Sequence, residues 1–188
     1  MLEGKQLEPF RVSIPTCRYE LTEGRDGPRV PRRARLAYRD IASATNRLTL
    51  IAAIVPPRAV TTHTLFCLKT PLPVDAQHVL SALLNSFVAN YLVRMRVNTH
   101  VTVALVSRLP MPVLHEQSES YATLVRLSRA LAAGDRPIDD MPEYAELQAL
   151  AARLYGLTRE EFEHVLSTFP LIPVETRARA LRRFHDCE

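Results

Sequence analysis

Ten basic or amide side chains could contact DNA, and they lie near the ends of predicted strands and of the longest predicted helix. An Arg side chain can bind a backbone phosphate through its charge. In the major groove, Arg can also recognise guanine, and Asn can recognise adenine, through paired hydrogen bonds. The ten candidates are Arg32, Arg33, Arg35, Arg39, Asn46, Arg47, Arg58, Arg94, Arg96 and His100.

Each candidate also has a structural interpretation, which the sequence leaves open. Residues 24–35, GRDGPRVPRRAR, combine turn residues with clustered arginines and are equally typical of a solvated linker. Asn46 is also a common turn residue, and Arg39 is a candidate ion-pair partner. Cations such as Arg94 and Arg96 complement the negative end of a helix. Charge and spacing alone therefore do not separate DNA contacts from structural roles.

Catalytic motifs are absent from the sequence. Val55–Arg58 has the Pro-Pro spacing of the loop used by enzymes that methylate exocyclic amines, but the flanking residues are wrong. Valine cannot accept a hydrogen bond from the target amine, and arginine offers no aromatic ring for a flipped-out base. No glycine-rich fingerprint follows a predicted strand, and the cysteines form no CxxC pair. We expect a non-catalytic chain without a cofactor or a metal.

Composition and charge indicate a globular chain with two different parts. Of its 188 residues, 47% are hydrophobic, but no apolar run approaches the ~20 residues of a membrane span. The N-terminus lacks the layout of a signal peptide, so we expect a soluble cytoplasmic protein without a membrane partner. Residues 1–66 carry 11 Lys/Arg against 6 Asp/Glu, whereas residues 116–188 carry 9 against 13. The basic part favours a polyanionic partner.

The periodicity of the first two-thirds predicts strands around one long helix. Apolar and β-branched runs predict strands at 36–44, 48–55, 61–68 and 101–106, with a turn at 45–47 between the first two. Asp75 is the candidate N-cap of the helix, whose apolar residues recur every four positions as far as Met95. A basic segment, Arg94 to His100, lies at the C-terminal end of this helix.

The last third is predicted to be helical. Helices are expected at 121–133, 144–155, 159–168 and 174–184. Gly134 and Gly156 follow the first two, and Thr158 with Glu161 has the spacing of a capping box. The predicted class is α+β: a mixed β-sheet with a long packed helix, followed by a C-terminal helical subdomain. We divide the chain into an N-terminal segment with a basic loop (1–35), an α+β core (36–115) and a helical region (116–188).

Four phrases, in this order, resemble one family. They are LEGKQLEPFRV, YRDIASATNRLTLIAAIVPP, LLNSFVANYLVRMRVNTHVTVALVSRLPMP and LQALAARLYGLTREEFEHVLSTFP. Together they are similar to the C-terminal target-recognition region of adenine-specific DNA methyltransferases of restriction-modification and phage-defence systems, including those with a TaqI-like specificity domain. The resemblance covers residues 2 to 185.

The resemblance implies a target-recognition-domain-like fold and a non-catalytic specificity module that binds double-stranded DNA. Its partner would be a methyltransferase or restriction catalytic domain or subunit, and S-adenosylmethionine would bind only to that separate or missing domain. The alternative is a protein-interaction module that docks a methyltransferase or another defence-system subunit through its acidic helical third.

Overall fold

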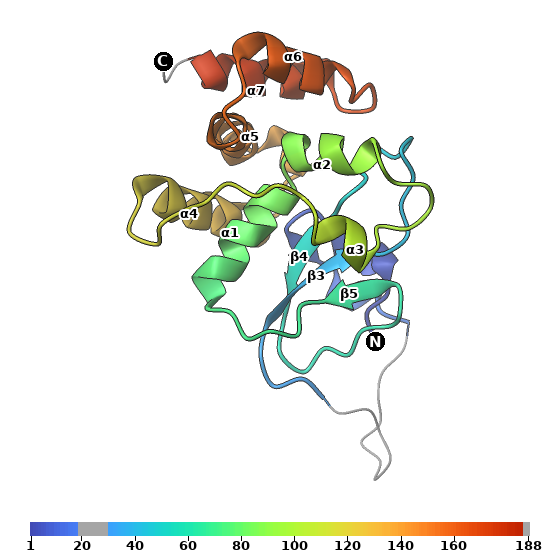
Figure 1. Ribbon diagram of the computed structural model, residues 1–188. Coiled ribbons are helices and arrows are strands. Elements are labelled where there is room, and N and C mark those ends of the chain that lie inside the picture. Colours follow the sequence, from blue (N-terminus) through green and yellow to red (C-terminus); the bar gives the residue numbers. More distant parts are fainter. Residues whose placement is uncertain (19–29, 186–188) are drawn as a thin grey trace.

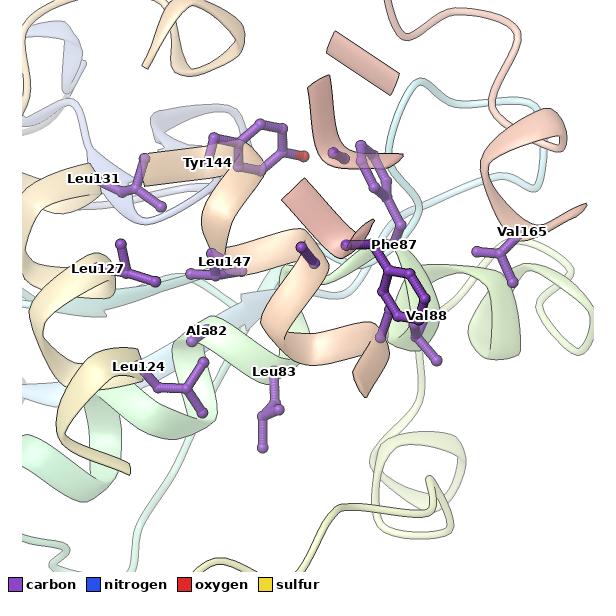
Figure 2. Close-up of a cluster of buried hydrophobic side chains, with 14 of the residues drawn as sticks. Ala82, Leu83, Phe87, Val88, Leu124, Leu127, Leu131, Tyr144, Leu147 and Val165 are labelled. Atoms are coloured by element: carbon purple, nitrogen blue, oxygen red, sulfur yellow. The ribbon is translucent and has the colours of Figure 1, made fainter. Parts of the chain in front are cut away.

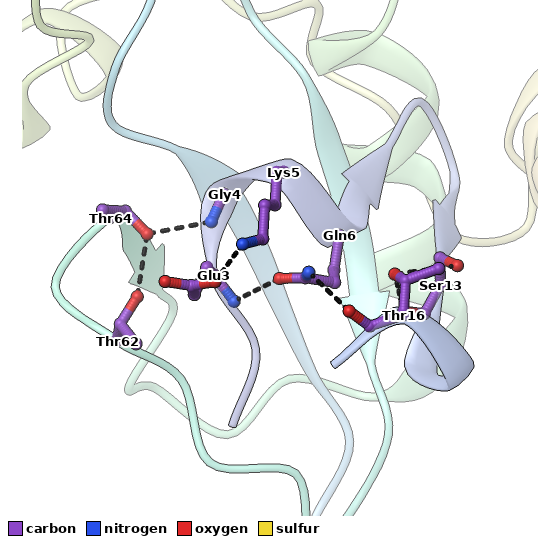
Figure 3. A network of polar contacts seen from close by, with 8 residues as sticks. All are labelled: Glu3, Gly4, Lys5, Gln6, Ser13, Thr16, Thr62 and Thr64. Atoms are coloured by element: carbon purple, nitrogen blue, oxygen red, sulfur yellow. Dashed lines mark hydrogen bonds and ion pairs between the residues drawn. The ribbon is translucent and has the colours of Figure 1, made fainter. Parts of the chain in front are cut away.

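The N-terminal residues are held against the rest of the molecule by backbone and threonine contacts. The computed structural model describes residues 1–18 and 30–185, so the first half of the predicted basic loop lies outside the described part. Two short strands, β1 (Leu7–Glu8) and β2 (Arg11–Val12), pair antiparallel after the 3-10 turn η1 (Gly4–Gln6), and η2 (Ile14–Thr16) follows them. The N–H of Gly4 donates to Thr64 Oγ1 at 2.8 Å (Figure 3), which ties this segment to the residues before the last strand.

A three-stranded sheet forms the centre of the first half of the chain (Figure 1). Its strands are β3 (Arg35–Arg39), β4 (Ala52–Val55) and β5 (Leu65–Cys67), in the order β4-β3-β5. Both pairs are antiparallel, and parallel pairing is found at the isolated bridges Leu2↔Thr61 and Phe10↔Ala53. Three of the four predicted strands are present but shorter than predicted, and β3 ends at Arg39.

The predicted long helix is broken into two, which corrects the sequence prediction. Helix α1 (Val74–Leu84) ends at Asn85, and α2 (Phe87–Arg94) begins after Ser86. Ser86 has extended backbone angles, and its Oγ accepts a hydrogen bond from the N–H of Ala89 at 3.1 Å, so it caps a new helix. Asp75 is not the N-cap of α1; that position belongs to Pro73, and Asp75 lies in the first turn.

Two buried asparagines at this break complete the hydrogen bonds of the neighbouring sheet edge. The N–H of Arg39 donates to Ile51 O, so Ala52 turns its own backbone groups away from β3. There the side chain of Asn85 accepts from the N–H of Ala52 at 3.0 Å and donates to its carbonyl at 2.8 Å. Asn90 Oδ1 accepts from the N–H groups of Thr49 and Leu50 at 2.9 and 2.8 Å. The N–H of Phe10 also donates to Ala52 O at 2.9 Å, so the two amides and the N-terminal segment together cover this edge.

The prediction of a last strand at 101–106 is wrong, because most of these residues form a helix. Val101 makes only a short pairing with the chain after β3, where its N–H donates to Asp40 O at 2.7 Å. The next residues form a short helix, α3 (Val103–Val106), because Thr102 Oγ1 accepts from the N–H of Leu105 at 3.2 Å and caps it. Leu105 and Val106 pack against the apolar cluster beside the sheet.

The C-terminal third is helical, as predicted. Helices α4 (Glu119–Ala133), α5 (Pro142–Leu154), α6 (Arg159–Ser167) and α7 (Val174–His185) follow in order, with the 3-10 turn η3 (Ile138–Asp140) before α5. Both hydrogen bonds of the capping box at Thr158 and Glu161 are present. Gly156 has a φ of 71°, as expected for the glycine after a helix. The α+β class is therefore confirmed.

The helical third shares its core with the first half of the chain. Phe87 of α2 packs edge-on against Tyr144 of α5 at 5.7 Å between ring centres, and Leu83, Leu124 and Leu147 lie in the same cluster (Figure 2). The predicted boundary at residue 115 therefore separates two stretches that are packed together. Among residues 1–18 and 30–185, every helix is too short or too polar to cross a lipid bilayer.

Removing either asparagine amide should destabilise the fold. Asn85→Ala and Asn90→Ala leave buried backbone groups without partners, and we expect each to lower the free energy of unfolding by about 3 kcal/mol. Asn98 is exposed. Asn98→Ala should therefore change the free energy of unfolding by less than about 0.5 kcal/mol. Urea denaturation followed by circular dichroism measures all three, and equal effects at the three positions would contradict this account.

Candidate nucleic-acid interface

Three of the ten candidate residues converge on one cavity, which we call the basic cavity. It lies where the start of β3, the residues after β5 and the start of α1 meet, and its volume is about 620 Å³. Its lining includes four cationic side chains and, among the described residues, no carboxylate. The cations are Arg32, Arg33, Arg35 and Lys69. An uncompensated cluster of this kind attracts anions.

Strand pairing brings these cations together. Arg35 is the first residue of β3 and pairs with Val55 of β4. On the other side of β3, the N–H of Leu68 donates to Leu36 O at 2.8 Å, which extends the β5 pairing and places Lys69 beside the start of β3. Arg35 Nη2 donates to Ala59 O at 2.7 Å, whereas its Nη1 is shielded from solvent and has no hydrogen-bond partner. Arg32 and Arg33 are exposed.

Gln77 also lines the basic cavity, and it is not among the ten residues predicted from the sequence. It is 4% exposed, in the first turn of α1. Its Nε2 donates to Leu72 O at 3.0 Å, and its Oε1 is buried without a partner. A signal existed in the sequence: Gln77 stands three and seven positions before Leu80 and Leu84, so it continues the sheet-facing side of the helix.

A second group of candidates meets at the end of α2, where internal contacts hold the key side chain. Arg94 Nη1 donates to Thr168 O at 2.5 Å and Nη2 to Asn46 O at 2.6 Å. The guanidinium lies 4.2 Å from the ring centre of Phe169, and burial lowers its pKa. Arg47 forms an ion pair with Asp139. Arg94 therefore connects the turn after β3 with the C-terminal end of α6.

The other candidates are dispersed. Arg39 is half-buried and donates to Leu7 O; burial lowers its pKa, and Glu8 opposes that shift. His100 Nδ1 lies 3.1 Å from Asp40 Oδ2, and Arg96 is exposed just after α2. Arg58 is exposed, and its backbone N–H donates to Pro31 O at 2.7 Å beside the basic cavity. The ten residues therefore do not form one continuous surface.

An apolar cavity of about 720 Å³ adjoins the basic cavity. It is enclosed by β3, β5, α1 and α3, and the two cavities share Leu36 and residues 66–69. The rings of Tyr38 and Phe66 lie 5.5 Å apart in its wall. Burial raises the pKa of Tyr38 to about 12, with a further contribution from Asp40, so its hydroxyl stays protonated at neutral pH.

Comparisons with known proteins found no relative. A scan against protein-family models, a search of curated proteins and a search of solved structures gave no match.

Substitution of Arg94 should lower the free energy of unfolding, whereas substitution of Arg96 should leave it almost unchanged. Arg94→Lys loses the forked contacts to two carbonyls and the stacking on Phe169, and we expect a loss of about 2 kcal/mol in the free energy of unfolding. Arg96→Ala removes an exposed side chain and should cost less than about 0.5 kcal/mol. Urea titration of both variants tests this, and a tolerated Arg94→Lys would show that the internal contacts contribute little.

Proposed function

We propose that this chain is a non-catalytic DNA target-recognition module that binds double-stranded DNA and serves a restriction-modification-type adenine methyltransferase in the cytoplasm. The observation that carries the proposal is the basic cavity, whose lining contains four cationic residues and no carboxylate among the described residues. Phosphate binding needs such unpaired cations, because an arginine already paired with a carboxylate has little charge left to offer.

The distribution of ion pairs supports this location. In the helical third, three of the nine arginines, Arg126, Arg129 and Arg182, form an ion pair with a carboxylate. By contrast, the structure shows no such pair for Arg32, Arg33, Arg35 or Lys69 among the described residues. The cations of the basic cavity are therefore better placed to bind a phosphodiester backbone. The resemblance to methyltransferase target-recognition regions supplies the proposed partner, and S-adenosylmethionine would then bind to the partner.

A second candidate function is a protein-interaction module that docks a methyltransferase or another defence-system subunit. The apolar cavity beneath α3 favours it, since concave apolar surfaces are typical sites for a partner's apolar side chains. Val103 of α3 lies at this cavity and is 57% exposed. Co-purification with a catalytic subunit, without affinity for duplex DNA, is the result expected for this alternative.

Duplex binding should depend on the cations of the cavity and on salt. We expect the affinity for random duplexes to fall as salt rises, and Arg32→Gln, Arg33→Gln and Lys69→Gln to weaken binding uniformly across sequences. Each lost phosphate contact should reduce the salt slope by about 1. Fluorescence anisotropy with labelled duplexes at several salt concentrations measures both quantities.

The matched control is Arg159→Gln, which removes an exposed cation on α6, far along the chain from the cavity. It should leave the affinity and the salt slope unchanged. Absence of salt-sensitive duplex binding in the unmodified protein would overturn the proposed function. Equal losses for the control and the cavity variants would overturn the location.

A further inference from the structure

A second cluster of cations lies in the helical third, where α7 packs beside the start of α5. It borders a cavity of about 340 Å³, which we call the α7 cavity. Its described lining consists of Pro142, Ala145, Arg179, Arg182, Arg183 and His185. No carboxylate is among these residues, and none of them lines the basic cavity. The α7 cavity is therefore a separate, positively charged site.

Helical spacing brings the three arginines together on one side of α7. Arg179 stands three and four positions before Arg182 and Arg183, and residues at these separations are neighbours on a helix surface. Like charges at this spacing destabilise a helix. The α5 residues of the lining, Pro142 and Ala145, bring no negative charge to offset them. The described lining therefore lacks the anion that would stabilise this cluster.

Arg179 is held in place without losing its charge. It is half-buried, and its Nη2 donates to Asp139 O at 2.7 Å. A backbone carbonyl carries no net charge, so it orients the guanidinium without neutralising it. The carboxylate of Asp139 forms an ion pair with Arg47 instead. A half-buried cation attracts an anion more strongly than a fully solvated cation does, because water screens the two charges less.

Arg183 has no carboxylate partner in the described part of the chain. Its side chain is exposed, and it also borders a neighbouring cavity that is lined by Glu119 and Glu146. Among the described residues, neither carboxylate forms an ion pair with it, and Glu146 pairs with Arg126 at 2.6 Å. The guanidinium of Arg183 is therefore available to an external anion.

Arg182 is the least available of the three arginines. Its Nη2 lies 2.6 Å from Glu175 Oε1. The two side chains are 60% and 67% exposed, so this ion pair is well solvated and contributes little to stability. The site therefore depends mainly on Arg179 and Arg183.

We propose that the α7 cavity binds a phosphate group, whose oxygens accept hydrogen bonds from Arg179 and Arg183. The planar guanidinium group matches phosphate oxygens in geometry and in charge. A volume of about 340 Å³ lies at the lower end of the range for small-molecule sites, so the cavity has room for a phosphate with a small attached group. The inference goes beyond the proposed function, because α7 lies at the end of the molecule away from β5 and the basic cavity (Figure 1).

Titration of the full chain with inorganic phosphate, followed by NMR through the Nε–H signals of the arginines, tests the inference at the site itself. We expect the signals of Arg179 and Arg183 to shift in a saturable manner. Arg183→Gln should weaken the phosphate affinity measured at Arg179 by about tenfold or more, the effect of losing one hydrogen bond to a charged group. Arg179→Gln should weaken the affinity measured at Arg183 in the same way.

Arg159→Gln is the matched control, because it removes one exposed cation of α6 that does not line the α7 cavity. It should leave the phosphate affinity at Arg179 and Arg183 unchanged. Circular dichroism checks the fold of each variant. Arg183→Gln maintains the test if Arg179→Gln unfolds, since it replaces an exposed side chain without an ion pair among the described residues.

A phosphodiester of DNA and a small phosphorylated molecule offer the same chemistry, and duplex binding distinguishes these two sources. Fluorescence anisotropy with labelled duplexes at several salt concentrations compares Arg183→Gln with the unmodified chain. A lower duplex affinity, with a salt slope reduced by about 1, would assign the phosphate to the DNA backbone. An unchanged duplex affinity, with weakened binding of inorganic phosphate, would assign it to a small phosphorylated molecule. Both results support the phosphate site.

Two results would overturn the inference. One is the absence of saturable shifts at Arg179 and Arg183, and the other is an equal loss of phosphate affinity in Arg159→Gln, which would indicate diffuse attraction. The arginines in the last turn would then only complement the negative end of α7. Salt-sensitive duplex binding without shifts in α7 would overturn this inference and leave the proposed function standing. Shifts in α7 without any duplex binding would do the reverse.

Discussion

The hydrogen bonds between two buried asparagines and the edge of β4 are the constraint on which the rest of the fold depends. The N–H groups of Thr49, Leu50 and Ala52 have no partner in a neighbouring strand, and leaving them unpaired in the core would be costly. Asn85 and Asn90 satisfy them, but only because the chain breaks between α1 and α2. The break in turn exposes the N–H of Phe87, which donates to Gln148 Oε1 of α5 at 2.6 Å. One polar network therefore joins the sheet, the α1–α2 pair and the helical third.

The same arrangement determines where charge is available. The sheet register places the first residue of β3 and the residues after β5 at one corner, and α1 starts there with Gln77. In the helical third, Arg126 pairs with Glu146 and Arg182 with Glu175, and Arg129 pairs with Asp75 of α1, so part of the positive charge there is neutralised. The proposed DNA contacts are assigned to that corner because four cations line one cavity there, without a lining carboxylate among the residues that the structure describes.

Local signals in the sequence were sufficient for the C-terminal helices. Thr158, Glu161 and Gly156 act within a few residues of their own position, so the capping box and the left-handed turn could be predicted without knowledge of the fold. Predictions failed where a distant partner decided the structure and where a local helix cap was overlooked. The uninterrupted helix was wrong because Asn85 bonds to a strand that lies 33 positions earlier in the chain. The last predicted strand was wrong because, in the described chain, its β-branched residues have a helix cap at Thr102 and no strand to pair with.

For the candidate site, too, one part could be predicted from the sequence and another part required the structure. Sequence alone determined the helical third, the α+β class and a list of cations, including Arg32, Arg33 and Arg35, since residue type and local spacing carry that information. Only the tertiary structure decided which cations face a shared cavity and which, like Arg94, are bound to internal carbonyls. It also added Gln77, whose role depends on the carbonyl of Leu72 and on its burial against the sheet. Contacts between distant residues set these roles, and the local pattern indicated only which side of α1 carries Gln77.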